Sequence, residues 1–398
     1  MAQDKDQKTL NVPPLRFTGF TDEWKECTIR DIAKIEKGNG ISKDQLSEEG
    51  DECILYGELY TKYKSEIIDE VYSKTKVDST KLMRSQANDV LIPCSGETAE
   101  DIATARCVKM EGILLGGDLN IMRFDKQDGA FMSYQLNGKR KYDIARVAQG
   151  VSVVHLYPEH LKSIKVVLPE LEEQQKIVNL LSLIDERIAT QNKIIEKYES
   201  LIKGLNNILL YATGGKSVCL GDILLERSER SRTNNQHEVL SSTVKGIFSQ
   251  REYFSKDIAS ENNVGYKIIR LHDVVLSPQN LWMGNINYND RFEIGIVSPS
   301  YKVFSIADGY DNQFVAAMLK THRALYSYMM VSEQGASIVR RNLNMEAFSQ
   351  LVFKIPSLDK QREIGCAISL LKSQLKTANK IIRAYTSQKQ YLLCQMFI

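Results

Sequence analysis

The stretch LPELEEQQKIVNLLSLIDERIATQNKIIEKYESLIKGLNNIL (residues 168–209) returns near the end of the chain as IPSLDKQREIGCAISLLKSQLKTANKIIRAYTSQKQYLLCQM (residues 355–396). The two copies align without a gap at a constant offset of 187 residues, which places Pro169 on Pro356, Gln174 on Gln361 and Tyr198 on Tyr385. A repeat of this length without gaps is not a coincidence of composition, so the chain is built as two copies of one plan.

Both copies carry the pattern of a long amphipathic helix. Apolar residues recur alternately four and three positions apart, which is the spacing of a coiled-coil seam. Proline stands just before each pattern and acidic residues follow it, as is typical of a helix start. We therefore predict two helices of about 33 residues, each about 50 Å long at 1.5 Å per residue. The seam positions are Ile177, Leu181, Ile184, Ile188, Ile195, Tyr198, Ile364, Ile368, Leu371, Leu375, Ile382 and Tyr385.

The two helices are expected to pack on each other. A single apolar stripe would equally fit a helix that lies on its own domain, but two copies of equal length and phase favour an antiparallel coiled coil that relates the halves by a pseudo-two-fold axis. Lys389 stands at an otherwise apolar position, and Gln191 opposite Ala378 also breaks the seam. Such polar positions in a seam could set its register.

The segments between the helices predict mixed α/β domains. Short β-branched and aromatic runs, such as 89–93 and 273–278, alternate with turn residues. The predicted organisation is a polar tail (1–14), a first domain (15–167), a first helix (168–212), a second domain (213–354) and a second helix (355–398). The fold class is therefore α/β, with two mixed domains that are each followed by a long helix.

Composition narrows the class of protein. Lys and Arg total 52 against 50 Asp and Glu, for a net charge of +2, so any basic surface must come from local segregation of charge. The seven cysteines show no CxxC spacing and the five histidines no HxxH spacing, which predicts reduced thiols of a cytoplasmic protein and no zinc site. No apolar run is long enough for a membrane helix, and no secretory signal is visible.

Motifs of catalysis are missing from the sequence. Gly215-Lys216-Ser217 resembles the end of a phosphate loop, but Leu210 stands where that loop needs glycine, and a helix precedes it instead of a strand. We find neither a GxSxG elbow nor a GxGxxG that opens a helix. The sequence therefore favours a binding protein without catalytic or metal-ligating residues of its own.

Two diverged domains on a rigid spacer would suit the reading of two different targets at a fixed separation. On DNA, polar side chains at loop tips could reach base edges, and basic clusters could contact phosphates. An ordinary solvated turn would equally explain each loop, and a partial core position would explain Trp282. The candidates for DNA contact are Ser95, Thr98, Lys139, Arg140, Lys141, Gln279, Asn280, Trp282, Asn285, Arg340, Arg341 and Asn342.

The chain resembles the specificity (S) subunits of type I restriction–modification systems over about residues 15 to 398. The resemblance starts in Leu15-Arg16-Phe17-Thr18-Gly19-Phe20-Thr21-Asp22-Glu23-Trp24 and continues through Asp31-Ile32 and Gly221-Asp222-Ile223. It is strongest in the paired helices, with their Pro-x-Leu-x-x-Gln starts at 169 and 356.

This resemblance implies two target-recognition domains, each reading one half of a bipartite site in double-stranded DNA. The helices would set the spacer and dock methyltransferase subunits, two in number, and restriction subunits would join that core. S-adenosylmethionine, ATP and Mg2+ would be cofactors of those partners and not of this chain, which would be a non-catalytic subunit in the cytoplasm of a bacterium or archaeon.

Two alternatives remain open at the level of sequence. The first is a specificity-like subunit of a methylation-only or phage-exclusion system, which would share every feature described above. The second is a coiled-coil scaffold that binds protein partners and no DNA. The scaffold offers no reason for two domains that share an outline while differing in sequence.

Overall fold

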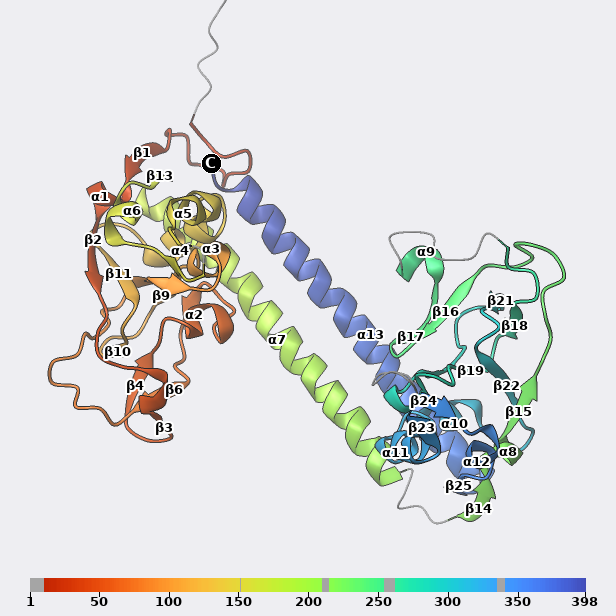
Figure 1. Ribbon diagram of the computed structural model, residues 1–398. Coiled ribbons are helices and arrows are strands. Elements are labelled where there is room, and N and C mark those ends of the chain that lie inside the picture. Colours follow the sequence, from red (N-terminus) through yellow and green to blue (C-terminus); the bar gives the residue numbers. More distant parts are fainter. Residues whose placement is uncertain (1–10, 151, 210–214, 254–261, 335–340) are drawn as a thin grey trace, which may run out of the picture. The chain divides into compact units, whose positions relative to one another are not determined.

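The computed structural model describes residues 11–150, 152–209, 215–253, 262–334 and 341–398 (Figure 1). The chain divides into two compact units of mixed α/β structure. Unit 1 comprises Met1–Asn192 and Lys380–Ile398, and unit 2 comprises Lys193–Asn379. The boundaries cut both long helices, so each unit holds one part of each helix.

The two long helices are α7 (Leu171–Leu209) and α13 (Leu358–Gln395). They contain 39 and 38 residues, so each is about 58 Å long at 1.5 Å per residue. The prediction of two long helices is confirmed, and both are longer than expected because the helix begins almost directly after the proline. Within the described residues, no helix is long and apolar enough to cross a membrane.

The remaining elements of unit 1 are short helices and strands. The helices are α1 (Ile29–Ile32), η1 (Lys43–Gln45), α2 (Glu58–Thr61), α3 (Ala99–Ile102), α4 (Gly129–Asn137), α5 (Lys141–Val147) and α6 (Pro158–Lys162). The strands are β1 (Lys25–Thr28), β2 (Ala33–Lys37), β3 (Leu46–Ser47), β4 (Asp51–Ile54), β5 (Ile67–Ile68), β6 (Ser73–Thr75), β7 (Asp89–Pro93), β8 (Ser95–Gly96), β9 (Arg106–Val108), β10 (Leu114–Leu115), β11 (Leu119–Phe124), β12 (Val154–His155) and β13 (Lys165–Leu168).

Unit 2 is built from a similar set of elements. Its helices are α8 (Leu220–Ile223), α9 (Gln250–Tyr253), η2 (Leu281–Met283), α10 (Asn312–Met318), α11 (His322–Met330) and α12 (Met345–Ser349). Its strands are β14 (Lys216–Cys219), β15 (Leu224–Arg227), β16 (Leu240–Thr243), β17 (Gly246–Ser249), β18 (Lys267–Arg270), β19 (Val274–Leu276), β20 (Ile286–Tyr288), β21 (Ile294–Val297), β22 (Lys302–Ile306), β23 (Ser332–Gln334), β24 (Arg341–Leu343) and β25 (Val352–Ile355).

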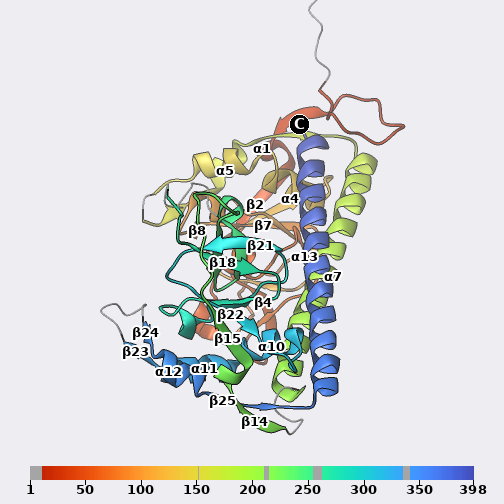
Figure 2. The ribbon, with the colours of Figure 1, turned by 90° about the vertical axis from the view of Figure 1, so that its right-hand side faces the viewer.

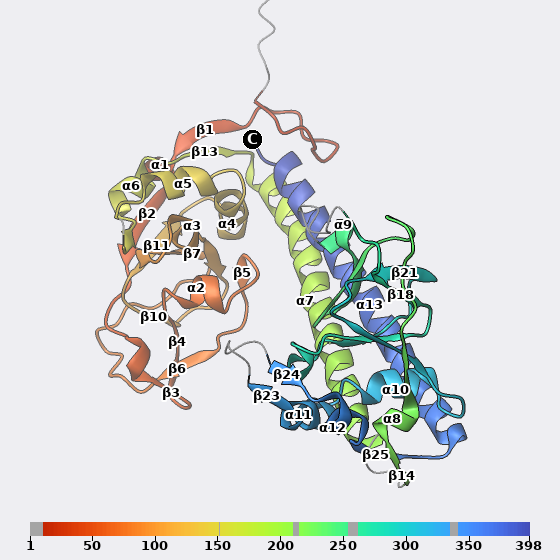
Figure 3. The same cartoon turned by 45° about the vertical axis from the view of Figure 1, so that its right-hand side comes forward.

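The same topology recurs in both units. In unit 1, β1 pairs antiparallel with β13 just before α7, and in unit 2, β14 pairs antiparallel with β25 just before α13. The central sheets begin with matching orders, β2-β11-β7 and β15-β22-β19. Unit 1 adds a four-stranded sheet, β10-β4-β6-β3, which Figure 3 shows at the end of the unit away from β1 and β13. The duplicated framework is therefore common to both units, and the additions to it differ.

A buried glutamine repeats the same contacts at the start of each long helix. Gln174 donates from its amide to the carbonyl of Pro169 at 2.9 Å and accepts from the backbone N–H of Asp128 at 3.0 Å. Gln361 makes the equivalent bonds to Pro356 and Asp311, both at 2.9 Å. The two aspartates are the N-caps of α4 and α10. Each long helix is thus fastened to one helix of its own unit, α7 to α4 and α13 to α10.

The first turns of each long helix belong to the core of one unit. Ile177, Leu181 and Ile184 are buried in the core of unit 1, together with Leu392 of α13 and Met396, which directly follows that helix. Ile364 and Ile368 are buried in the core of unit 2 in the same way. These seam residues are buried and fix the helices to their own units.

The two long helices run antiparallel within each unit. In unit 1 the guanidinium of Arg187 lies over the ring of Tyr385 at 5.9 Å, and Asp185 pairs with Lys389, as expected where α7 and α13 lie side by side in opposite directions (Figures 1 and 2). In unit 2 Ile202 of α7 and Leu375 of α13 line one cavity. The remaining seam residues, Ile188, Ile195, Tyr198, Leu371, Ile382 and Tyr385, are half-buried.

Lys389, which interrupts the apolar seam, forms ion pairs inside unit 1. Its ammonium group pairs with both Glu66 and Asp185, and all three side chains are nearly buried, with exposed fractions of 13%, 9% and 9%. The hydroxyl of Tyr134 also donates to Asp185 at 2.7 Å. Burial and the neighbouring carboxylate of Glu66 raise the pKa of Asp185, whereas Lys389 lowers it. This network joins the first domain to both long helices.

We predict that Lys389→Met destabilises the protein by about 3–5 kcal/mol, because it leaves two buried carboxylates without a cation. The free energy of unfolding from urea titration measures the effect. Adding Asp185→Asn and Glu66→Gln to the variant should recover much of the loss. Lys376→Met, at an exposed lysine of the same helix, is the matched control. A loss below about 1 kcal/mol for Lys389→Met would show that the network is not structural.

Candidate functional site

The first candidate loop, 95–98, lies in unit 1 between β8 and α3. Ser95 is buried, with 7% of its surface exposed, and its hydroxyl donates to Asp118 at 3.2 Å. Thr98 is the N-cap of α3, where its hydroxyl oxygen accepts from the N–H of Asp101 at 3.1 Å. Both side chains are therefore held within the loop, and Thr98 remains exposed beyond its cap.

The second candidate group, 139–141, lies between α4 and α5. Lys139 is exposed, whereas Arg140 is half-buried and donates to the carbonyl of Ile398 at 3.3 Å. Lys141 is the first residue of α5. Helix α3 packs against α5, so the structure brings the loop at 95–98 and this basic turn onto neighbouring elements.

The candidate residues of unit 2 gather around the loop between β19 and β20. The exposed Gln279 accepts at its backbone carbonyl from the N–H of Arg341 at 3.1 Å. The guanidinium of Arg341 lies over the indole ring of Trp282 at 5.1 Å. Asn342, the next residue of β24, is exposed. Residues far apart in the sequence thus form one surface of polar and aromatic groups, which we call the Trp282 surface (Gln279, Asn280, Trp282, Arg341 and Asn342).

Two polar atoms on the Trp282 surface have unused hydrogen-bonding capacity. Among the described residues, Oδ1 of Asn280 and Nε of Arg341 are buried atoms without a hydrogen-bond partner. Unpaired buried atoms cost stability unless a ligand or water pairs with them. An acceptor and a donor are the groups that pair with the edge of a base. Arg340 lies outside the described residues.

Asn285 stands apart from the other candidates. It is 5% exposed, and its amide bonds with Ser242, whose hydroxyl donates to Asn285 Oδ1 at 2.8 Å. Asn287 donates to the same hydroxyl at 2.7 Å. The placement of Asn285, like that of Ser95, favours a structural role. A run of Asn residues in a sequence does not reveal whether their amides point outward or pair with a neighbouring strand.

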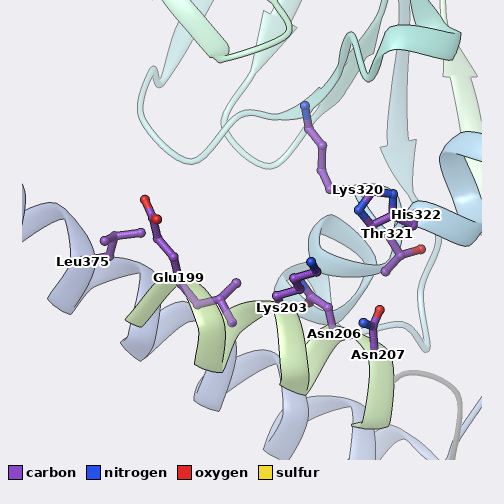
Figure 4. Close-up of a pocket in the computed structure, with 9 residues that line it drawn as sticks. Glu199, Lys203, Asn206, Asn207, Lys320, Thr321, His322 and Leu375 are labelled. Atoms are coloured by element: carbon purple, nitrogen blue, oxygen red, sulfur yellow. The ribbon is translucent and has the colours of Figure 1, made fainter. Parts of the chain in front are cut away.

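The sequence analysis did not single out Lys320, which contacts the loop between β19 and β20. Its ammonium donates to the carbonyl of Gly284 at 2.7 Å. Figure 4 shows Lys320 beside Thr321 and His322 and facing away from α7, at the edge of a cavity of about 270 Å3 that Lys203, Asn206 and Asn207 also line. Burial, reinforced by Lys372, lowers the pKa of Lys320 to about 8. In the sequence, the only sign that Lys320 could be buried was its position just after an apolar helical run.

The lowered pKa of Lys320 predicts a pH dependence of stability. The unfolded chain holds this proton up to about pH 10.5, whereas the folded chain releases it near 8. Between these values the unfolded state binds more protons, so raising the pH through this window favours the folded state. The stabilisation from this group should therefore grow between pH 8 and 10.5. Thermal melts of the wild type and of Lys320→Met should show a smaller rise over this window for the variant, and equal slopes would contradict the assignment.

The outer faces of the long helices carry a duplicated pair of apolar residues. Leu183 and Leu370 occupy equivalent positions in the repeat and are 56% and 60% exposed. Ile194 and Ile381 are likewise equivalent, and they are 37% and 38% exposed. Exposed apolar residues that recur at matching positions are typical of a binding surface that is used twice.

Comparison with known proteins gives these surfaces a family context. Residues 21–200 match the family model described as "Type I restriction modification DNA specificity domain". This segment, which is slightly less than half of the chain, is similar to that family. The resemblance seen in the opening segment and in the paired helices is thereby confirmed.

One curated relative and two solved structures of type I systems are also similar to this chain. The MjaVIII specificity subunit of Methanocaldococcus jannaschii is 28% identical over 204 residues, which are 50% of this chain and 43% of the relative. The chain thus matches less than half the length of that relative. The S subunit of a type I restriction–modification system from M. genitalium superposes with a TM-score of 0.64 at 16% identity, covering 97% of this chain and 99% of the other.

The second solved structure concerns the assembly and conformational transition of a type I restriction–modification system. One of its chains superposes with a TM-score of 0.50 at 12% identity, covering 93% of this chain and 96% of the other. At these identities the likeness shows the fold. The mixed α/β fold with two long helices is therefore that of type I specificity subunits.

Proposed function

We propose that this protein is the DNA-binding specificity subunit of a type I restriction–modification complex. In this proposal the domain of unit 1 reads one half of a bipartite target in double-stranded DNA, and the domain of unit 2 reads the other half. The long helices fix the spacer between the halves. The chain carries no chemistry itself and directs the enzymes that bind to it.

The observation that carries the proposal is a duplicated framework with different loops. Both units repeat the glutamine contacts, the strand pairs and the N-capped helices described above. At equivalent places, however, unit 1 presents Thr98 and unit 2 presents the Trp282 surface. A common frame with different exposed side chains is what two readers of two different sequences require, since side chains at the groove determine which base is accepted.

The duplicated apolar residues support the docking of two copies of one partner. Leu183 and Leu370 lie on α7 and α13, and each is exposed on its own unit. We propose that each forms the centre of a docking surface for one methyltransferase subunit, and that restriction subunits join this core. S-adenosylmethionine, ATP and Mg2+ would then be bound by the partners, and the complex would work in the cytoplasm of a bacterium or archaeon.

The test of the proposed function is a map of methylated adenines from long-read sequencing. A bipartite motif should be present in the source strain, absent after deletion of the gene and restored by the wild-type gene. A strain in which deletion changes no motif, although a methyltransferase subunit co-purifies with the chain, would contradict the proposal.

The same map tests the Trp282 surface. Arg341→Ala should relax or change one position in the half-site that unit 2 reads, because loss of a bidentate contact to guanine costs about 1–3 kcal/mol. The other half-site should stay unchanged. Lys354→Ala, at an exposed lysine of β25, is the matched control and should leave the whole motif intact. A motif that is unchanged in Arg341→Ala would remove this surface from the recognition site.

The docking proposal makes a stoichiometric prediction. Leu183→Asp or Leu370→Asp should each remove one methyltransferase subunit, because a charge at the centre of an apolar contact disfavours binding, and the double variant should lose both. Mass measurement of the purified complex reads the result. Leu225→Asp, at a residue of β15 that is 50% exposed, is the control. Full complexes in both single variants would show that the partners bind elsewhere.

A further inference from the structure

A pocket in unit 1 is not explained by anything described so far. It has a volume of about 560 Å3, within the range of small-molecule sites. Three separate segments line it: 41–46, 55–62 and 117–118. Ile41 and Leu55 are buried and supply an apolar wall, and Tyr56 and Tyr60 are half-buried and supply aromatic rings. An apolar and aromatic lining of this kind suits a flat ring, because stacking on an aromatic side chain is favourable for any base.

Asp118 places a carboxylate at this pocket in an unusual backbone conformation. Its φ is +58°, a left-handed conformation that costs a non-glycine residue about 1–2 kcal/mol. Aspartate is among the few non-glycine residues that adopt this conformation, so the turn fixes the direction in which the carboxylate leaves the backbone. The hydroxyl of Ser95 and the N–H of Cys94, which donates to the Asp118 carbonyl at 2.7 Å, hold the residue in place.

The charges around the pocket decide which ligand it suits. Glu58 is buried, and its carboxylate is satisfied by Lys62, Ser73 and the N–H of Leu55. Asp118 is exposed, and Glu97 and Asp101 act on the nearby Tyr60 hydroxyl. Lys43 also lines the pocket, and Lys62 is paired with Glu58, so the exposed carboxylate of Asp118 is available to accept a hydrogen bond from a ligand that donates one. Within the described residues, no set of three or more His, Cys, Asp or Glu side chains is placed to hold a metal ion.

The pocket also adjoins the candidate loop of unit 1. A Cβ built on Gly96 would lie 3.9 Å from the hydroxyl of Tyr60. Burial raises the pKa of Tyr60, with smaller contributions from Tyr56, Asp101 and Glu97, so its hydroxyl keeps its proton at neutral pH and can donate. The ring of Tyr60, the carboxylate of Asp118 and the loop at 95–98 therefore lie at the same pocket.

We propose that this pocket binds a nucleobase that carries an exocyclic amino group, adenine or cytosine, with the amino group donating to Asp118 and the ring lying against Tyr56 and Tyr60. The base can come from an unstacked nucleotide of DNA or from a free nucleoside. The DNA source rests on the proposed function, and the nucleoside source does not.

The test uses the full-length chain and four proteins. Asp118→Asn keeps the shape and tolerates the left-handed backbone, and Asp118→Gly removes the strain together with the carboxylate. Asp125→Asn changes an exposed aspartate just after β11, at the opposite end of that strand from Asp118, and is the matched control. Circular dichroism and thermal melting first establish that each variant is folded.

Isothermal titration with adenosine, cytidine and uridine forms the first arm. Adenosine or cytidine should bind to the wild type and to Asp125→Asn, and should bind at least about fivefold more weakly to both Asp118 variants. Uridine, which has no amino group, should bind more weakly than cytidine. Equal binding of uridine and cytidine would overturn the assignment of the amino edge to Asp118.

The methylated motif forms the second arm and separates the two sources. A change at one base of one half-site in both Asp118 variants, but not in Asp125→Asn, places the base in DNA. Nucleoside binding without a change of motif places it in a free nucleoside. Folded Asp118 variants with an unchanged motif, together with a wild type that binds no nucleoside, overturn the proposal. A wild type that directs no methylation contradicts the proposed function. In that case the titration alone tests whether the pocket binds a nucleobase.

Discussion

One buried glutamine in each unit orients the rest of the structure. A helix start leaves backbone groups without partners, and the amide of Gln174 or Gln361 supplies both a donor and an acceptor there. Because these side chains are 1% and 2% exposed, water cannot replace them, and each lost bond would strand a buried polar group. The direction of each long helix is thereby set against the domain core. Every surface that the helices or loops present depends on that direction.

The repeat with its proline starts was sufficient to predict both long helices and the two-part architecture. It was not sufficient to say what the apolar stripe packs against, since periodicity shows which face of a helix is buried but not its neighbour. Ile177 and Ile364 are buried in domain cores, and Lys389, an apparent defect of the stripe, pairs with Glu66 and Asp185. The candidate surface was predicted only in part, because the contact between Trp282 and Arg341 depends on folding and leaves no local pattern in the sequence.

The two units share their framework but differ in the side chains that it carries. In the repeat, Asp185 corresponds to Lys372 and Lys389 corresponds to Ile202. Unit 1 therefore joins its helices and domain through a buried ionic network, whereas unit 2 has a cavity at the same level, lined by Ile202 and Leu375. A duplicated fold can diverge in this way because the glutamine contacts and strand pairs fix the position of each long helix on its unit. Other positions are then free to change.

The core of unit 1 contains Leu392 from the last turn of α13 and Met396 and Phe397 just after it, and the N–H of Leu15 donates to the carbonyl of Gln395 at 2.9 Å. Segments almost 400 residues apart in the sequence therefore complete the same unit. During synthesis, unit 2 has all of its residues once the ribosome has passed residue 379, while unit 1 still waits for its final apolar side chains. Of the two units, unit 1 is thus the earlier to begin and the later to have its core completed.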